Sequence, residues 1–151
     1  AFPFVAKIGR GSALGRGIYL IRNAADLEEY NSLGRTAYIQ EYLEIDRDLR
    51  VVLIRGKMIL AYWRIAQPGE FRSNVSQGAT ISFDDIPEEG LDLARDTARL
   101  CQLDDVGLDI CFSKGRYWVL EANMKFGREG FRRAGIDYYE LMDEMIENGE
   151  I

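Results

Sequence analysis

The stretch that decides the fold is residues 106–123, which read VGLDICFSKGRYWVLEAN. Both halves are strongly apolar, and Ser113-Lys114-Gly115 between them is a turn signal, so we expect a hairpin of two strands. Asp109 and Glu121 interrupt these apolar runs. Because a buried carboxylate needs a cation or hydrogen bonds, both residues become candidates for a functional site.

A third polar residue, Asn123, lies two positions after Glu121, so the two share a face if the strand extends through both. A three-residue turn, with Gly115 in the left-handed conformation, would place Asp109 on that face, whereas a two-residue turn would place it on the opposite one. Two carboxylates and an amide oxygen on one face are hard ligands of the kind that magnesium takes. The residues alone leave metal binding and a solvated hairpin face equally open.

The rest of the chain alternates strands and helices, which indicates the α+β class. Leu49–Ile54 and Met58–Arg64 read as a second hairpin across Arg55-Gly56-Lys57. We expect helices over 24–33, capped by Asn23, over 87–101, with Pro87 as the first helical residue, and over 136–148. Shorter strands are expected over 4–8, 18–21 and 37–43, and irregular loops over 67–79 and 123–135.

Composition excludes several classes of function. The 151 residues suit one domain, which buries ~70% of its unfolded surface. A net charge of −6 disfavours a nucleic-acid partner. The chain has no histidine, so catalytic triads and His-ligated zinc sites are absent. Any catalysis must use carboxylates, Arg, Lys, backbone amides or a hard metal ion.

The cysteine count and the hydropathy pattern predict a cytoplasmic protein with no membrane partner. Cys101 and Cys111 form neither a disulfide framework nor a metal motif, and we expect both to be buried in a reduced compartment. No apolar run approaches the ~18 residues of a membrane span. The abrupt start, Ala1-Phe2-Pro3, suggests that an N-terminal part of the protein is missing.

Two further segments could bind anions. Lys7 lies inside an apolar strand and precedes the loop of residues 9–17, whose four glycines would let backbone N–H groups approach phosphates. A flexible hairpin loop is the alternative.

The polar segment around Arg72, together with Arg64, could bind a phosphate or a carboxylate. The alternative is a solvated loop. Asp48 and Arg50 share a strand face, and by themselves read as a surface ion pair.

In order along the chain, these pieces resemble an ATP-grasp enzyme, and more narrowly a RimK-type carboxylate–amine ligase. The resemblance is carried by four segments that span nearly the whole chain: PFVAKIGRGSALGRGIYL, YIQEYLEIDRDLRVVLIRGKMILAYWR, GEFRSNVSQGA and VGLDICFSKGRYWVLEAN. It implies an ATP-grasp core with a lid subdomain over 1–43 and a metal- and phosphate-binding subdomain over 44–151. The N-terminal domain of such enzymes would be absent.

The resemblance assigns roles by position. It implies that Mg²⁺, with Mn²⁺ as the alternative ion, is held by Asp109, Glu121 and Asn123. Three arginines would face the reaction centre: Arg50, Arg64 and Arg72. Residues expected to contact ATP are Lys7, Gly11, Ser12, Gly15, Gln40, Glu41, Tyr42, Leu43, Asp48, Arg72, Ser73 and Asn74.

The implied reaction joins glutamate or a similar amino acid to a carboxylate acceptor, a small molecule or a protein C-terminus, through an acyl-phosphate. Alternatives are a glutathione-synthetase-like or lysine-biosynthesis-type ligase, or a non-catalytic nucleotide-binding module. The chain departs from RimK relatives at Glu44, at Gln77 and over Met124–Arg128. The last two should border the acceptor, so the acceptor and the oligomeric state stay open.

Overall fold

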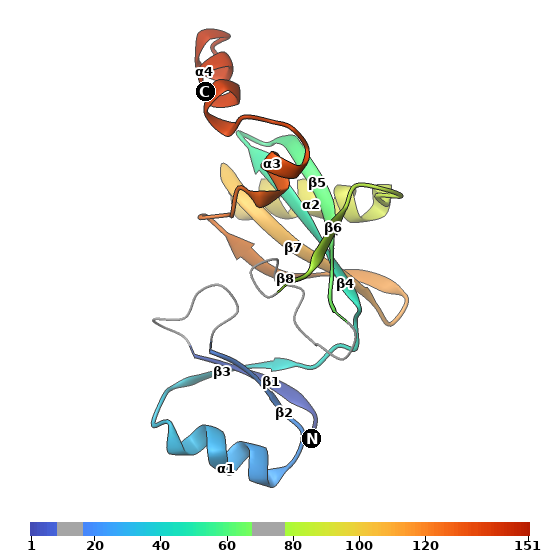
Figure 1. The fold of residues 1–151 in the computed structure, drawn as a ribbon, viewed down its shortest axis with the longest axis vertical. Helices are drawn as coiled ribbons and strands as arrows, with labels where there is room; N and C mark the ends of the chain where they lie inside the picture. Colours follow the sequence, from blue (N-terminus) through green and yellow to red (C-terminus); the bar gives the residue numbers. More distant parts are fainter. Residues whose placement is uncertain (9–16, 68–77) are drawn as a thin grey trace. The chain divides into compact units, whose positions relative to one another are not determined.

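The computed structural model describes residues 1–8, 17–67 and 78–151, and these form two compact units, Ala1–Glu44 and Ile45–Ile151. The first unit is a three-stranded antiparallel sheet, in the order β2-β1-β3, with one helix (Figure 1). Its elements are β1 (Phe4–Ile8), β2 (Ile18–Ile21), α1 (Ala24–Ser32) and β3 (Ala37–Glu41).

Helix α1 begins where the sequence predicts. The Asn23 side chain accepts a hydrogen bond from the backbone N–H of Asp26 at 3.0 Å, and Gly34, at φ 61°, follows the helix end. Tyr30 of α1 packs with Ala6 and Ile21 to form the small core of this unit. One sheet face is therefore covered by α1.

The second unit is built on a five-stranded antiparallel sheet in the order β6-β5-β4-β7-β8. Its strands are β4 (Arg47–Ile54), β5 (Lys57–Ile65), β6 (Thr80–Ser82), β7 (Asp105–Ser113) and β8 (Arg116–Asn123). Strand β6 directly follows the loop expected over 67–79 and was not predicted from the sequence. Strand β4 is central, and seven of its eight residues are buried.

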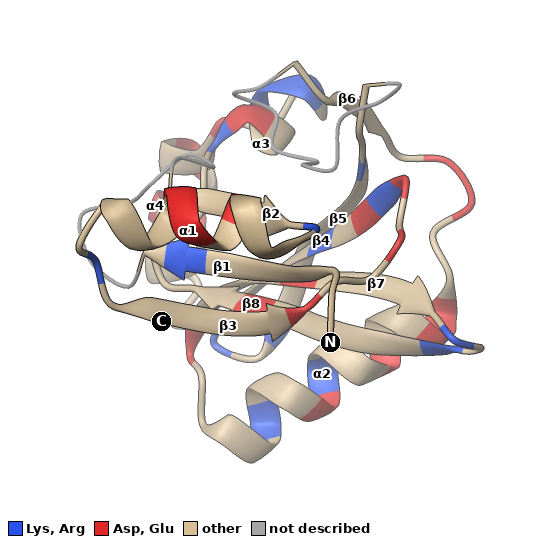
Figure 2. Cartoon of the chain, turned by 90° about the horizontal axis from the view of Figure 1, so that it is seen from below, with Lys and Arg blue, Asp and Glu red and all other residues tan. Residues whose placement is uncertain are grey.

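Helix α2 (Glu88–Cys101) covers one face of this sheet with its small residues Ala94 and Ala98, which pack on Leu49, Val51 and Leu108. The rest of α2 carries four acidic and two basic residues, and Figure 2 shows such positions along the helix in red and blue. Pro87 is the residue before the helix, with φ −78° and ψ 128°, and not its first helical residue as expected.

The other face carries an aromatic cluster and two short helices, α3 (Glu129–Arg133) and α4 (Tyr138–Glu147). Phe131 of α3 is 1% exposed and packs with Val52, Leu60 and Tyr62 of the sheet. The sequence predicted a loop where α3 forms. Asp137 caps α4, because its Oδ1 accepts the N–H of Tyr139 at 2.8 Å.

The turn between β7 and β8 has two residues, not the three needed by the expected geometry. Ser113 pairs with Arg116, and Lys114 and Gly115 both have positive φ. A register shift between Asp109 and Ile110 nevertheless restores the pairing: Ile110 lies opposite Val119, whereas Asp109 lies opposite Glu121. The bulge inserts one extra residue in β8 and brings both carboxylates to the same face.

The predicted burial of the two cysteines is correct for Cys111 only. Cys111 is buried in β7, but Cys101 is exposed at the end of α2, which corrects the expectation that both are buried. Within the described residues, no helix combines the length and the hydropathy needed to cross a membrane.

Candidate active site

The centre of the second unit holds four charged side chains on the sheet face opposite α2. Strand pairing explains the grouping, because Asp48 of β4 lies opposite Arg64 of β5, and Arg50 of β4 lies opposite Asp109 of β7. Residues that lie directly opposite, or two apart on one strand, share a face of the sheet. Alternation along β4 thus sends Leu49 and Val51 to the α2 core and the two charges to the other side.

The four groups form one connected network. Arg64 Nε donates to Asp48 Oδ1 at 2.6 Å, and Arg64 Nη2 lies 2.9 Å from Asp109 Oδ2. Arg50 forms a two-pronged pair with Asp109, in which Nε donates to Oδ1 and Nη2 donates to Oδ2 at 3.0 Å. Asp48 and Arg50 thus have different partners and do not form the surface pair that their spacing alone suggested.

The network is shielded from solvent: Asp48, Arg50, Arg64 and Asp109 are 3%, 7%, 6% and 5% exposed. Burial by itself lowers the pKa of Arg64, but the carboxylates of Asp109 and Asp48 more than offset it and raise that pKa. Buried ion pairs of this kind seldom add net stability, while removing one partner costs about 3–5 kcal/mol. Such an arrangement is typical of a site kept for its chemistry.

Glu121 and Asn123 lie beside this network on β8. Glu121 is directly across from Asp109, and Asn123 is across from Gly107. Asn123 Nδ2 donates to Asp109 Oδ2 at 3.4 Å, while Glu121 is exposed. The three expected metal ligands are therefore brought together on one patch of the sheet.

The donor chemistry of this patch fits magnesium, because two carboxylates and an amide supply hard oxygens. Asp109 accepts four donors, two from Arg50 and one each from Arg64 and Asn123. A carboxylate offers about four lone-pair sites, so one of these donors would have to move aside for an ion. Among the described residues, no group of three or more Asp, Glu, Cys or His side chains is placed to hold a metal ion, so the third ligand on this patch would be the Asn123 amide.

In the first unit, Lys7 of β1 lies opposite Ile18 and Tyr38, and Val5 lies opposite Gln40. Lys7 and Gln40 therefore share the sheet face opposite to the one that packs on α1. Glu41 ends β3 on the α1 side, and the half-buried Tyr42 and Leu43 follow it. This face places a cation and a polar edge strand together, as a nucleotide site would require.

Six of the expected site residues lie outside the described part of the chain: Gly11, Ser12, Gly15, Arg72, Ser73 and Asn74. Their proposed roles rest on the sequence alone.

Two residues of the site were not singled out from the sequence. Tyr62 is 3% exposed and lies opposite Arg50; burial raises its pKa, and the nearby arginines oppose this shift. Gly107 lies between Arg50 and Phe126: a Cβ at position 107 would come within 2.7 Å of the Phe126 Cβ and 3.3 Å of Arg50. Tyr62 could have been found, because Leu60, Tyr62 and Arg64 alternate along one strand and so share a face. The sequence gives no signal for Gly107.

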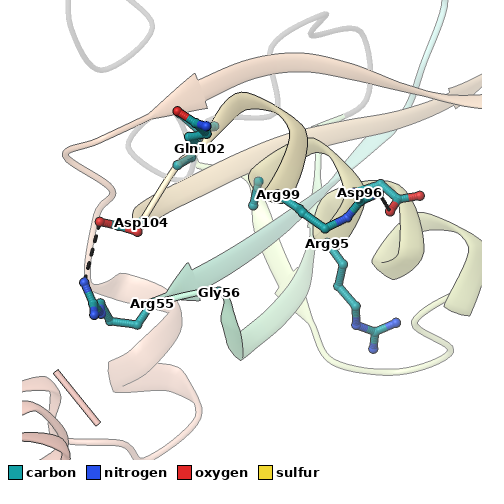
Figure 3. Close-up of a pocket in the computed structure, with 9 residues that line it drawn as sticks. Arg55, Gly56, Arg95, Asp96, Arg99, Gln102 and Asp104 are labelled. Carbon is teal, nitrogen blue, oxygen red and sulfur yellow. Dashed lines mark hydrogen bonds and ion pairs between the residues drawn. The ribbon is translucent and has the colours of Figure 1, made fainter.

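A separate hollow of about 550 Å³ lies at the end of α2 and carries three arginines (Figure 3). Each arginine already has a carboxylate: Arg99 pairs with Asp96 at 2.9 Å, and Arg55 lies 3.7 Å from Asp104. Arg95 contacts Glu88 and Asp92 at 2.7 and 2.6 Å. With its charges matched and its side chains exposed, this hollow has no property of an anion site.

Comparison with known proteins agrees with this geometry. The RimK-like ATP-grasp domain matches residues 1–147. The chain is 31% identical to coenzyme γ-F420-2:α-L-glutamate ligase of Methanocaldococcus jannaschii, over 96% of this chain and 52% of that protein. It is 32% identical to ribosomal protein bS6–L-glutamate ligase of Escherichia fergusonii, over 96% of this chain and 50% of that protein. It thus spans about half the length of these relatives.

Solved structures show the same fold. The ATP-grasp ligase PsnB, determined with precursor peptide PsnA2 and AMPPNP, superposes with a TM-score of 0.69 at 26% identity, covering 99% of this chain and 47% of that chain. D-alanine–D-alanine ligase of Bacillus anthracis with ATP has a TM-score of 0.68 at 20% identity, over 97% and 52%. The α+β fold with two antiparallel sheets is therefore that of a partial ATP-grasp module, and the chain belongs to the RimK-like ATP-grasp domain family.

Proposed function

We propose that the protein containing this chain is an ATP- and Mg²⁺-dependent ligase that joins an amino acid, glutamate or a similar one, to a carboxylate acceptor. The observation that carries the proposal is the buried Asp48–Arg64–Asp109–Arg50 network, with Glu121 and Asn123 next to it in the sheet register. Four buried charges add little net stability, so they fit a catalytic site better than a non-catalytic module. Family membership supplies the reaction type.

The reaction would run in two steps. An acceptor carboxylate oxygen attacks the γ-phosphorus of ATP, and ADP leaves with the electrons of the broken P–O bond. The amine then attacks the acyl carbon of the acyl-phosphate, loses a proton, and expels inorganic phosphate to leave an amide. Such transfers need positioning and charge neutralisation more than a nucleophilic side chain, which suits a chain without histidine.

Each part of the chain has a place in this scheme. Residues 44–151 would be the metal- and phosphate-binding subdomain, where bound Mg²⁺ would be held by Asp109, Glu121 and Asn123 and would neutralise phosphate charge. Arg50 and Arg64 would orient the transferring phosphoryl group and the acceptor, and Arg72 would share this role. Residues 1–43 would be the lid.

Nucleotide contacts complete the proposal. Lys7 would bind the phosphates, and the backbone of Gln40 to Leu43 would hold the adenine. Asp48 would face the nucleotide while it fixes Arg64. The relatives named for bS6 and for coenzyme γ-F420-2, and the peptide complex of PsnB, support an acceptor that is a protein end or a small molecule. The two free cysteines support a reducing, cytoplasmic setting.

The test is a calorimetric titration of this chain, and of the complete protein, with ATP in the presence and absence of Mg²⁺. We expect saturable binding that Mg²⁺ strengthens, and phosphate release by the complete protein only when an amino acid and an acceptor are both present. Binding without any amine-dependent phosphate release, across a panel of amino acids and acceptors, would identify a nucleotide sensor instead.

A further inference from the structure

Arg128 packs against two aromatic rings. Its guanidinium carbon lies 4.2 Å from the ring centre of Tyr138 and 4.4 Å from that of Tyr139. The two rings meet edge to face, with their centres 6.0 Å apart. Cation–π contacts with two neighbouring tyrosines restrict a side chain that would otherwise have many rotamers. These contacts therefore fix the position of the Arg128 guanidinium.

Neither capping nor ion pairing explains this arrangement. Arg128 is the residue before α3 and makes no side-chain capping bond there. The nearby Arg132 and Arg133 both pair with Glu129, at 2.9 and 3.1 Å, whereas no described carboxylate pairs with Arg128. A guanidinium keeps its N–H donors in its own plane, so ring contacts leave them able to reach an acceptor.

The segment that carries Arg128 borders the proposed reaction centre. It follows directly after Asn123, and Phe126 lies against Gly107, beside the Arg50 side chain. Tyr138 also contacts the Phe126 ring, with a centroid distance of 6.4 Å. A chain of contacts thus links Arg128, through Tyr138 and Phe126, to the sheet face of the ionic network.

The charge of the segment has the sign needed for an anion. Residues 124–133 contain four basic side chains and one acidic side chain, in a chain of net charge −6 (Figure 2). Helix α2 differs, because its sequence has four acidic and two basic side chains. An isolated guanidinium with free N–H donors suits a planar, two-oxygen partner.

We propose that Arg128 is a specificity-determining residue that binds a substrate carboxylate, with Tyr138 and Tyr139 as its positioning residues. The inference rests on the proposed ligase function. The bound group would be a carboxylate that is not itself activated, carried by the acceptor or by the incoming amino acid. Arg128 would select that substrate for its negative charge.

The test measures equilibrium binding to the complete protein saturated with Mg²⁺ and AMPPNP. One arm compares an acetylated pentapeptide ending in glutamate with its glutamine-ended analogue; the other compares L-glutamate with L-glutamine. In one arm the unmodified protein should prefer the charged ligand by about tenfold, as expected for a charge-assisted pair. Arg128→Gln should remove that preference, and Arg128→Lys should restore it in part.

Two further variants separate binding from folding. Arg132→Gln, which removes a neighbouring exposed arginine, should keep the preference. Tyr139→Phe should keep it, and Tyr139→Ala should reduce it, because only the ring holds Arg128. Nucleotide affinity should stay the same in every variant.

The outcomes distinguish this inference from the proposed function. No charge preference in either arm, or a preference that Arg128→Gln leaves intact, overturns the role of Arg128 even if phosphate release confirms the ligase. A preference that Arg128→Gln abolishes, in a protein that never releases phosphate, supports the role of Arg128 and rejects the ligase.

Discussion

Arg64 and Asp109 lie on strands that are not neighbours, and their 2.9 Å ion pair crosses the central strand β4. Arg64 also holds Asp48 of β4 at 2.6 Å, so one guanidinium ties three strands together. Asp109 in turn accepts Arg50 from β4. Each of the two residues is thus shared between partners, and a change at either should affect the whole network.

Replacing Arg64 with methionine should destabilise the protein strongly. The change leaves the Asp48 carboxylate, 3% exposed, without its guanidinium partner at 2.6 Å. Removing one partner of a buried ion pair costs about 3–5 kcal/mol, and we expect the free energy of unfolding to fall by about 3 kcal/mol. Urea denaturation followed by circular dichroism measures this change.

The matched control is Arg99→Met, which removes an arginine whose side chain is 69% exposed and pairs with Asp96 on α2. Solvent screens such a pair, and the change should stay within about 0.5 kcal/mol. Equal losses in the two variants would show that the buried network contributes no more than a surface pair.

The sequence predicted most helices and strands, though not β6 or α3, and it singled out Asp109, Glu121 and Asn123 as candidates without showing how they meet. From the sequence, we expected that only a three-residue turn at Ser113-Lys114-Gly115 would bring Asp109 to the same sheet face as Glu121. The structure has a two-residue turn and reaches the same pairing through a bulge at the step between Asp109 and Ile110. A bulge depends on packing along the whole strand pair, and no local residue pattern shows it.

The ion-pair partners on neighbouring strands also could not be predicted from the sequence. Asp48 and Arg50 are close in the chain, yet each pairs with a residue on another strand. A buried charge is costly unless an opposite charge lies beside it, and strand pairing decides which charges lie side by side. The exposed Cys101 is a similar case. Its place near the end of α2, next to the exposed Leu100, follows from helix phase and not from residue type.

Replacing Gly130 with alanine should disturb the face of the sheet that carries the site. A Cβ at this position would lie 2.2 Å from a ring carbon of the buried Tyr62, so α3 would have to move off the sheet. Overpacking of this kind costs about 1–3 kcal/mol, and we expect a value near the upper end. Thermal unfolding measures the loss.

Gly127→Ala is the matched control, since nothing lies within 4 Å of a Cβ there. Its stability should match that of the unmodified protein within about 0.5 kcal/mol. If Gly130→Ala proved equally harmless, the packing of α3 on Tyr62 would be much looser than the structure shows.

The two cysteines should differ sharply in reactivity. Burial raises the pKa of the Cys111 thiol to about 11, so only about one thiol in a thousand is ionised at pH 8. Cys101 is exposed. With Ellman's reagent at pH 8 we expect one thiol to react quickly and the second only after denaturant is added.

Cys101→Ser assigns the two phases, because it should remove the fast one and leave the slow one. A fast phase that persists in this variant would mean that Cys111 is accessible in the folded protein.

Glu121→Gln should separate folding from metal-dependent binding. Glu121 is exposed, and the amide keeps the shape of the side chain, so thermal stability should barely change. The variant loses one of the two carboxylates that face each other across β7 and β8. A neutral amide is a weaker partner for a divalent cation, so the gain in ATP affinity on adding Mg²⁺ should fall at least tenfold. Calorimetric titration with ATP, with and without Mg²⁺, measures that gain.

Glu147→Gln at the end of α4 removes another exposed carboxylate, outside the sheet, and should leave the gain unchanged. The comparison matters because a net charge of −6 could by itself attract Mg²⁺. An equal fall in both variants would indicate that general charge is responsible. Unchanged ATP–Mg²⁺ affinity in Glu121→Gln would remove Glu121 from the metal site. It would leave Asp109, which already accepts donors from Arg50, Arg64 and Asn123, as the one carboxylate of the site.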